Sequence, residues 1–135
     1  MILISISVSS RYWAIVPAAG TGSRMGASIP KQYLPLNGQP LVTYSVNALL
    51  ASEHIQSVVV AIAPQDTWWA SCDIADPSRV TVVPGGNTRA ESVYQALLAL
   101  QSTAKEDDWV LVHDAARPYL PLSLLHQLMN ALQDE

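Results

Sequence analysis

Glycines and two cations are concentrated in the stretch AAGTGSRMGASIPKQY, residues 18–33. Gly20 and Gly22 permit positive φ and close approach of a ligand to the backbone, so that successive amide N–H groups can surround phosphate oxygens. Arg24 supplies a fork of donors for paired oxygens, and Lys31 supplies a mobile positive charge. Neither GxxxxGK[ST] nor the glycine spacing of dinucleotide-binding loops occurs here. The stretch predicts a triphosphate-binding loop; the alternative is a glycine-rich turn with two solvated cations.

A second stretch that could contact a ligand is PGGNTRAES, residues 84–92. Gly85 and Gly86 allow tight packing against a flat group. The side chains that follow and offer hydrogen bonds are Asn87, Thr88, Arg89 and Ser92. These features suit the edge of a nucleobase, although two glycines before a capped helix are also typical of a simple connection.

The third stretch is HDAARPY, residues 113–119. Asp114 follows an apolar run, where a carboxylate costs stability unless it is paired or binds a cation, and its hard oxygens suit Mg²⁺. We favour metal binding over a plain ion pair with Arg117. His113 should point away from Asp114 by strand alternation, and no second His or Cys lies at metal-ligand spacing, so we expect a packed structural histidine.

The elements that must position these stretches alternate along the chain. Four apolar runs are typical of buried strands: 12–17, 57–63, 79–83 and 109–113. Three segments have helical spacing: one from Pro40, one from about residue 88 and one after Pro118. Thr88 and Glu91 have capping-box spacing, and Pro121 suits the first turn of the last helix. Residues 64–78 have no clear pattern.

Apolar strands separated by helices predict an α/β fold, a mainly parallel sheet with helices on both faces. Ligands of such sheets bind at the carboxyl ends of the strands. The three stretches follow the first, third and fourth expected strands. We therefore expect their residues to converge in space.

Bulk composition limits the classes of function. With 135 residues, of which 50% are hydrophobic, the chain is the size of one domain with one core. Only 13% of residues are charged and the net charge is -4, so we expect no nucleic-acid or membrane partner. The single cysteine, Cys72, points to a reducing compartment, the cytoplasm. The apolar residues 1–8 are too short to span a bilayer, and we expect them to lead into the first strand.

Taken together, the motifs resemble the 2-C-methyl-D-erythritol 4-phosphate cytidylyltransferase family. The fragments PAAGTGSRMG with PKQY, then GGNTRAESV, then VHDAARP occur in that order and at suitable spacing, and the resemblance runs from about Tyr12 to the last residue. It implies a Rossmann-like, three-layer αβα fold of nucleotidyltransferase type. It also implies transfer of CMP from CTP to a sugar-alcohol phosphate in isoprenoid biosynthesis, with Mg²⁺ required and pyrophosphate released.

The resemblance assigns roles to individual residues. Those implied to hold the triphosphate and part of the nucleotide are Ala18, Ala19, Gly20, Gly22, Arg24 and Lys31, with Arg24 and Lys31 as the catalytic cations. Those implied to recognise cytosine are Gly86, Asn87 and Ser92. Asp114 and Ala115 are expected beside the ribose and the metal.

By the same resemblance, residues 1–135 form the nucleotide-binding part of a single cytidylyltransferase domain, and the family continues for about another hundred residues (compare). That portion would supply the arm of a homodimer, a second carboxylate near the metal and the groups that hold the acceptor. We therefore expect the chain alone to be inactive. The alternatives are a cytidylyltransferase acting on ribitol or another pentitol phosphate, and a non-catalytic nucleotide-binding module.

Overall fold

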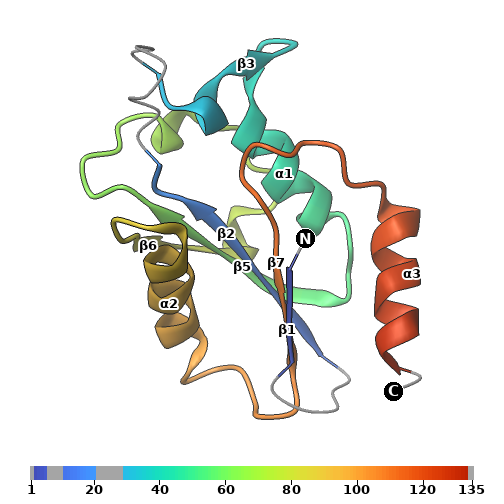
Figure 1. Ribbon diagram of the computed structural model, residues 1–135. Coiled ribbons are helices and arrows are strands. Elements are labelled where there is room, and N and C mark those ends of the chain that lie inside the picture. The colour runs from blue at the N-terminus through green and yellow to red at the C-terminus, as the bar shows by residue number, and fades with distance from the viewer. Residues whose placement is uncertain (1, 6–10, 21–28, 134–135) are drawn as a thin grey trace.

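One five-stranded sheet organises the computed structural model, which describes residues 2–5, 11–20 and 29–133 (Figure 1). Its strands, in the spatial order β1-β7-β2-β5-β6, are β1 (Ile2–Ser5), β7 (Trp109–Val112), β2 (Tyr12–Ala18), β5 (Ile55–Ile62) and β6 (Val80–Pro84). β2 pairs in parallel with β5 and β7, and β5 pairs in parallel with β6. Only β1 is antiparallel, against β7. The expected mainly parallel sheet is confirmed.

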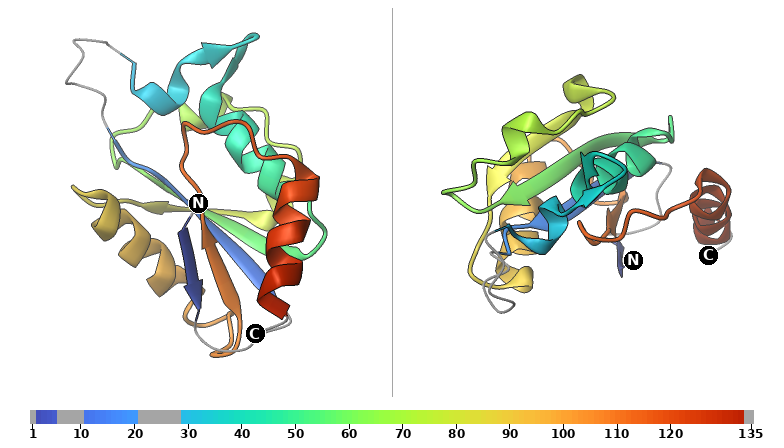
Figure 2. Two further views of the ribbon diagram at one scale, coloured as in Figure 1. Left: turned by 45° about the vertical axis from the view of Figure 1, so that its right-hand side comes forward. Right: turned by 90° about the horizontal axis from the view of Figure 1, so that it is seen from above.

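Helices cover both faces of the sheet. Among the described residues the α-helices are α1 (Leu41–Leu50), α2 (Arg89–Leu100) and α3 (Leu122–Gln133). α1 and α3 lie on one face and α2 lies on the other, which gives the expected three layers (Figures 1 and 2). α1 and α2 each begin one residue after the expected start, at Leu41 and Arg89, and α3 begins four residues after Pro118.

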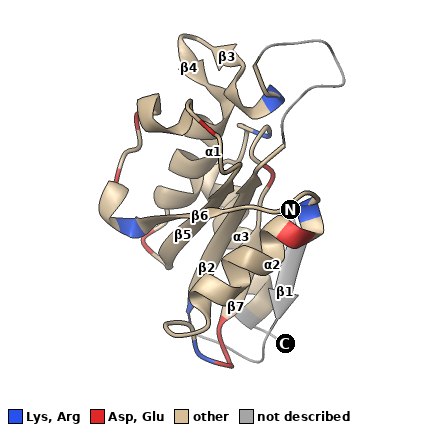
Figure 3. Cartoon of the chain, turned by 90° about the vertical axis from the view of Figure 1, so that its left-hand side faces the viewer, with Lys and Arg blue, Asp and Glu red and all other residues tan. Residues whose placement is uncertain are grey.

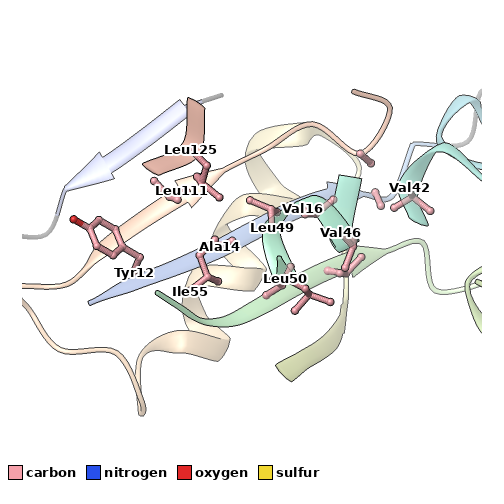
Figure 4. Packing of buried hydrophobic residues seen from close by; sticks show 14 of the residues in the cluster. Tyr12, Ala14, Val16, Val42, Val46, Leu49, Leu50, Ile55, Leu111 and Leu125 are labelled. Carbon is pink, nitrogen blue, oxygen red and sulfur yellow. The ribbon is translucent and has the colours of Figure 1, made fainter. Parts of the chain in front are cut away.

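The buried strands read as continuous apolar runs because both of their faces are covered. In β2, Ala14 and Val16 pack toward α1 and α3, whereas Trp13 and Ile15 pack toward α2. The larger cluster is seen from close by in Figure 4, where side chains of α1 lie against β2 and β5. Tyr12 Oη also donates a hydrogen bond to the Met129 backbone carbonyl, at 3.1 Å, and so ties β2 to α3.

The residues at the amino ends of α2 and α3 explain where these two helices begin. Glu91 N donates to Thr88 Oγ1 at 3.1 Å, so the predicted N-cap of α2 is confirmed. Pro121 lies just before α3, and its carbonyl accepts from Leu125 N at 3.1 Å. The expected place of Pro121 in the first turn is therefore off by one residue.

Two further segments differ from the sequence prediction. Residues 2–5 do not simply lead into the first parallel strand; they form β1, because the far edge of the apolar β7 offers unpaired backbone groups. A hairpin of β3 (Pro35–Leu36) and β4 (Gln39–Pro40) precedes α1, and its turn residues Asn37 and Gly38 have φ of 50° and 82°.

The unpatterned residues 64–78 contain two 3-10 turns, η3 (Trp69–Ser71) and η4 (Pro77–Arg79). Charged residues are sparse and spread over separate parts of the chain (Figure 3). None of the helices that the structure describes combines the length and the hydropathy needed to cross a membrane.

Candidate functional site

The three stretches converge on one pocket at the carboxyl ends of β2, β6 and β7. We call it the loop pocket; its volume is about 280 Å³, and its lining comes from residues 17–20, 31–32, 86–89, 92 and 114–116. The expected convergence is thus found. It arises because parallel strands place their carboxyl ends at the same edge of the sheet.

Most of the residues assigned to the site from the sequence lie in this lining. They are Ala18, Ala19, Gly20, Lys31, Gly86, Asn87, Ser92, Asp114 and Ala115. Gly22 and Arg24 lie outside the described residues. The structure therefore brings the described candidates together, while their roles toward a ligand stay predictions.

Gly85 is where the second loop packs against the first. Its backbone N–H donates to the Ile62 carbonyl at 2.7 Å. A Cβ placed on Gly85 would lie 2.5 Å from Ala19 Cβ and 2.7 Å from Ser92 Oγ. Glycine is thus required here for the close packing of two loops.

Gly20, in the first loop, has surroundings that differ from those of Gly85. Its φ is not in the positive range, so Gly20 does not use the positive φ that a glycine permits. A Cβ placed on Gly20 would meet no atom of the described residues within 4 Å. None of these residues would therefore block a ligand that approaches this backbone closely.

The second loop is held by side chains of α2. Gly86 N donates to Ser92 Oγ at 3.1 Å, and Asn87 N donates to Glu91 Oε2 at 2.7 Å. Ser92 is buried, with 2% of its surface exposed. These bonds fix the backbone of residues 86–87 at the amino end of α2, where the helix dipole favours negative charge.

Gln32 is a site residue that the sequence analysis did not single out. It is buried, and its Nε2 donates to the carbonyls of Ala18, at 2.9 Å, and Gly20, at 2.8 Å. It belongs to the 3-10 turn η2 (Lys31–Tyr33), which also carries Lys31. The fragment PKQY contained it, but a glutamine in a short turn has no pattern that predicts burial.

Tyr33 anchors the other side of η2. Its hydroxyl donates to Asp66 Oδ2, and its ring stacks on Trp68 with centroids 5.6 Å apart. Burial, together with the hydrogen bond to Asp66, raises the pKa of Tyr33 well above its usual value. Asp66 Oδ1 also accepts from the backbone N–H groups of Trp68 and Trp69, at 2.8 Å each.

Asp114 is paired with two arginines. Its Oδ1 accepts from Arg89 Nη2 at 2.5 Å and from Arg89 Nε at 3.2 Å, and its Oδ2 accepts from Arg117 Nε at 3.0 Å. Burial by itself would raise the pKa of Asp114, but the hydrogen bonds from both arginines outweigh it and hold that pKa below its usual value. The ion pair with Arg117 considered from the sequence is present, and Arg89 extends it to the second loop.

A Mg²⁺ ion could use this carboxylate only with ligands from elsewhere. Among the described residues, no three His, Cys, Asp or Glu side chains are grouped so that they could hold a metal. Mg²⁺ is often bound by one or two carboxylates plus substrate phosphates, and Asp114 fits that pattern as a single protein ligand. The metal assignment of Asp114 therefore stays a prediction.

His113 is packed away from the loop pocket, as expected. Only 4% of its surface is exposed, and its Nε2 donates to the Arg117 carbonyl at 2.8 Å. Its Nδ1 has no hydrogen-bond partner among the described residues. Burial lowers the pKa of His113, so the ring is neutral near pH 7.

Comparison with known proteins gives the family. The family described as IspD, 2-C-methyl-D-erythritol 4-phosphate cytidylyltransferase, matches residues 12–135. A protein of that name from Dechloromonas aromatica is 50% identical over 127 residues, covering 93% of this chain and 56% of the relative. Another of the same name, from Pseudomonas entomophila, is 46% identical over 130 residues, covering 96% and 55%.

Solved structures whose names place them in the same family superpose on this chain. A 4-diphosphocytidyl-2C-methyl-D-erythritol synthase superposes with a TM-score of 0.75 and 32% identity, covering 91% of this chain and 54% of that one. The Francisella tularensis 2-C-methyl-D-erythritol 4-phosphate cytidylyltransferase superposes with a TM-score of 0.72 and 34% identity, covering 90% and 52%.

The chain spans about half the length of the curated relatives it matches. The match nevertheless includes each loop of the pocket, from the residues after β2 to those after β7. The chain therefore belongs to the 2-C-methyl-D-erythritol 4-phosphate cytidylyltransferase family.

Proposed function

We propose that this chain is the nucleotide-binding part of an enzyme that transfers CMP from CTP to 2-C-methyl-D-erythritol 4-phosphate. The products are 4-diphosphocytidyl-2-C-methylerythritol and pyrophosphate, in isoprenoid biosynthesis by the non-mevalonate pathway. The observation that carries the proposal is the convergence of three loops on a single pocket at the carboxyl ends of β2, β6 and β7. The acceptor is proposed from family membership.

In this proposal the first loop holds the triphosphate. The backbone of residues 18–20 lines the loop pocket, and Lys31 contributes a positive charge to the same pocket. We assign Arg24, outside the described residues, as the second catalytic cation. Gly86, Asn87 and Ser92 are assigned to the cytosine and Ala115 to the ribose.

The chemistry needs no protein nucleophile. An oxygen of the acceptor phosphate attacks the α-phosphorus of CTP, and the bond from that phosphorus to the bridging oxygen breaks as pyrophosphate leaves. Repulsion between anions and charge growth around the α-phosphorus limit this reaction, so the cations Lys31 and Arg24 stabilise its transition state. Mg²⁺, when bound by Asp114 and phosphate oxygens, would neutralise further phosphate charge.

We further propose that the activity is cytoplasmic and that the full-length protein is a homodimer. The intermediate exposure of the lone Cys72 is compatible with a reducing compartment. The chain of residues 1–135 alone is expected to bind CTP weakly and to release no measurable pyrophosphate, since the acceptor must also be held close to the α-phosphorus.

The test is a chimera in which residues 12–135 replace the matching segment of the Dechloromonas aromatica relative. With CTP, Mg²⁺ and 2-C-methyl-D-erythritol 4-phosphate, we expect pyrophosphate release at about 1 per second or faster, and much slower release with UTP, ATP or GTP. The unmodified relative is the matched control. A folded chimera that binds CTP but releases no pyrophosphate would indicate a non-catalytic nucleotide-binding module.

A further inference from the structure

Gln32 ties together two parts of the first loop that are separated in sequence. Its side chain is 7% exposed, and both of its amide hydrogens are used, one toward the Ala18 carbonyl at 2.9 Å and one toward the Gly20 carbonyl at 2.8 Å. Gly20 and Gln32 are 12 residues apart. The glutamine thus joins the end of β2 to the turn where the loop returns.

These two bonds matter for the electrostatics of an anion site. A carbonyl oxygen carries partial negative charge and repels phosphate oxygens, so a backbone that binds phosphate must direct its carbonyls elsewhere. Here the carbonyls of Ala18 and Gly20 are engaged by a buried amide. Removal of that amide would leave them without these donors and free to reorient, at a cost typical of a lost buried hydrogen bond.

The same residue fixes the position of Lys31. Lys31 is exposed and lines the loop pocket, whereas the next two residues, Gln32 and Tyr33, are buried. Gln32 holds η2 to the end of β2, and Tyr33 holds it to Asp66 and Trp68. The backbone that carries the lysine is therefore held on two sides.

We propose that Gln32 is a positioning residue of the phosphate site. It acts through the backbone of Ala18 and Gly20 and through the turn that carries Lys31, and its effect is on the part of a nucleotide that bears the triphosphate. This inference rests on the proposed function, because it takes the loop pocket to be the nucleotide site. It predicts that loss of the Gln32 amide weakens the binding of a nucleoside triphosphate more than the binding of a nucleoside monophosphate.

The test compares CTP with CMP. Gln32→Met keeps the length of the side chain and removes both donors; Gln101→Met, at the exposed carboxyl end of α2, is the matched control. In calorimetric titrations of the 135-residue chain, we expect Gln32→Met to weaken CTP binding about tenfold or more and to leave CMP binding nearly unchanged. Should Gln32→Met fail to fold, Gln32→Leu, which also lacks both donors and carries no charge, is held to the same expectation.

Amide hydrogen exchange on the ligand-free chain provides a second, independent measurement. We expect Gln32→Met to speed exchange at residues 18–20 and 31–33 and to leave β5 unchanged. Equal weakening of CTP and CMP, no weakening of either, or unchanged exchange at both segments would overturn the inference. Absence of CTP binding by the unsubstituted chain would instead contradict the proposed function, and the exchange data would then decide on the positioning role.

Discussion

Arg89, in the first turn of α2, donates two hydrogen bonds to Asp114 Oδ1, at 3.2 Å from Nε and 2.5 Å from Nη2. This contact joins the second loop of the pocket to the third. Arg117 occupies the other carboxylate oxygen. A metal ion bound to Asp114 would therefore share the two carboxylate oxygens with the guanidinium groups of Arg89 and Arg117. An arginine released by the metal could donate to phosphate oxygens instead, which are suitable acceptors.

Substitution of Asp114 separates its two roles. Asp114→Asn keeps the size of the side chain and removes the charge that favours Mg²⁺, so the transfer rate of the chimera should fall and the Mg²⁺ concentration for half-maximal activity should rise. Arg117→Met is the matched control, since it breaks one ion pair and leaves the carboxylate. An unchanged Mg²⁺ requirement in Asp114→Asn would make Asp114 an ion-pair partner only.

The catalytic roles proposed for Lys31 and Arg24 are tested by measuring the rate of transfer. Lys31→Ala, or Arg24→Ala, should lower kcat of the chimera about a hundredfold or more, or roughly 3 kcal/mol, the usual scale for one preorganised electrostatic contact. Lys105→Ala removes an exposed lysine that lies outside the loop pocket and should leave kcat unchanged. Near-normal turnover in both Lys31→Ala and Arg24→Ala would refute their assignment.

Gly85, just outside the lining of the loop pocket, and Gly20, within it, should respond to alanine in opposite ways. In Gly85→Ala the new methyl group meets Ala19 and Ser92, so the free energy of unfolding should fall by about 1–3 kcal/mol. In Gly20→Ala the methyl group meets no atom of the residues that the structure describes, so stability should be unchanged within about 0.5 kcal/mol while CTP binding weakens. Urea titrations and calorimetry measure both. Normal CTP binding by Gly20→Ala would mean that the ligand does not approach this backbone.

His113 should make stability dependent on pH. Burial lowers its pKa in the folded chain below the unfolded value of about 6.5, so the unfolded chain binds the proton more readily. The contribution of the neutral ring is present above about pH 6.5 and is lost as the pH falls through the lower, folded pKa. Urea titrations from about pH 7 to pH 5 should therefore show a smaller loss of stability in His113→Gln, which cannot be protonated. An equal loss in both proteins would contradict this.

The parts of the fold that were predicted are those with a local cause. Thr88 and Glu91 were enough to place the start of α2, because a capping box is a contact between residues three apart. β1 was missed, since its pairing with β7 joins residues more than a hundred positions apart and a strand as short as Ile2–Ser5 does not specify an edge. The hairpin at Asn37 and Gly38 also has a local cause, because Asn-Gly is a turn signature whose two residues adopt positive φ.

Part of the candidate site was likewise predictable from the sequence, and part was not. Loop composition was sufficient to predict that the three stretches converge, because the parallel sheet dictates where strand ends lie. The buried donor role of Gln32 and the contact of Arg89 with Asp114 were not predictable, since each depends on the packing of side chains from two separate loops. The close packing of Gly85 on Ala19 likewise could not be predicted, because it depends on how two separate loops meet in space.

The central claim is that the loop pocket binds CTP. The direct measurement is a titration of the isotopically labelled chain with CTP in Mg²⁺, followed by amide chemical shifts, with GTP as the control nucleotide. We expect the largest shifts at residues 18–20, 31–32, 86–92 and 114–116, with weaker effects from GTP. Shifts confined to other surfaces, such as the groove between α2 and residues 104–106, or no shifts at millimolar CTP, would contradict the account.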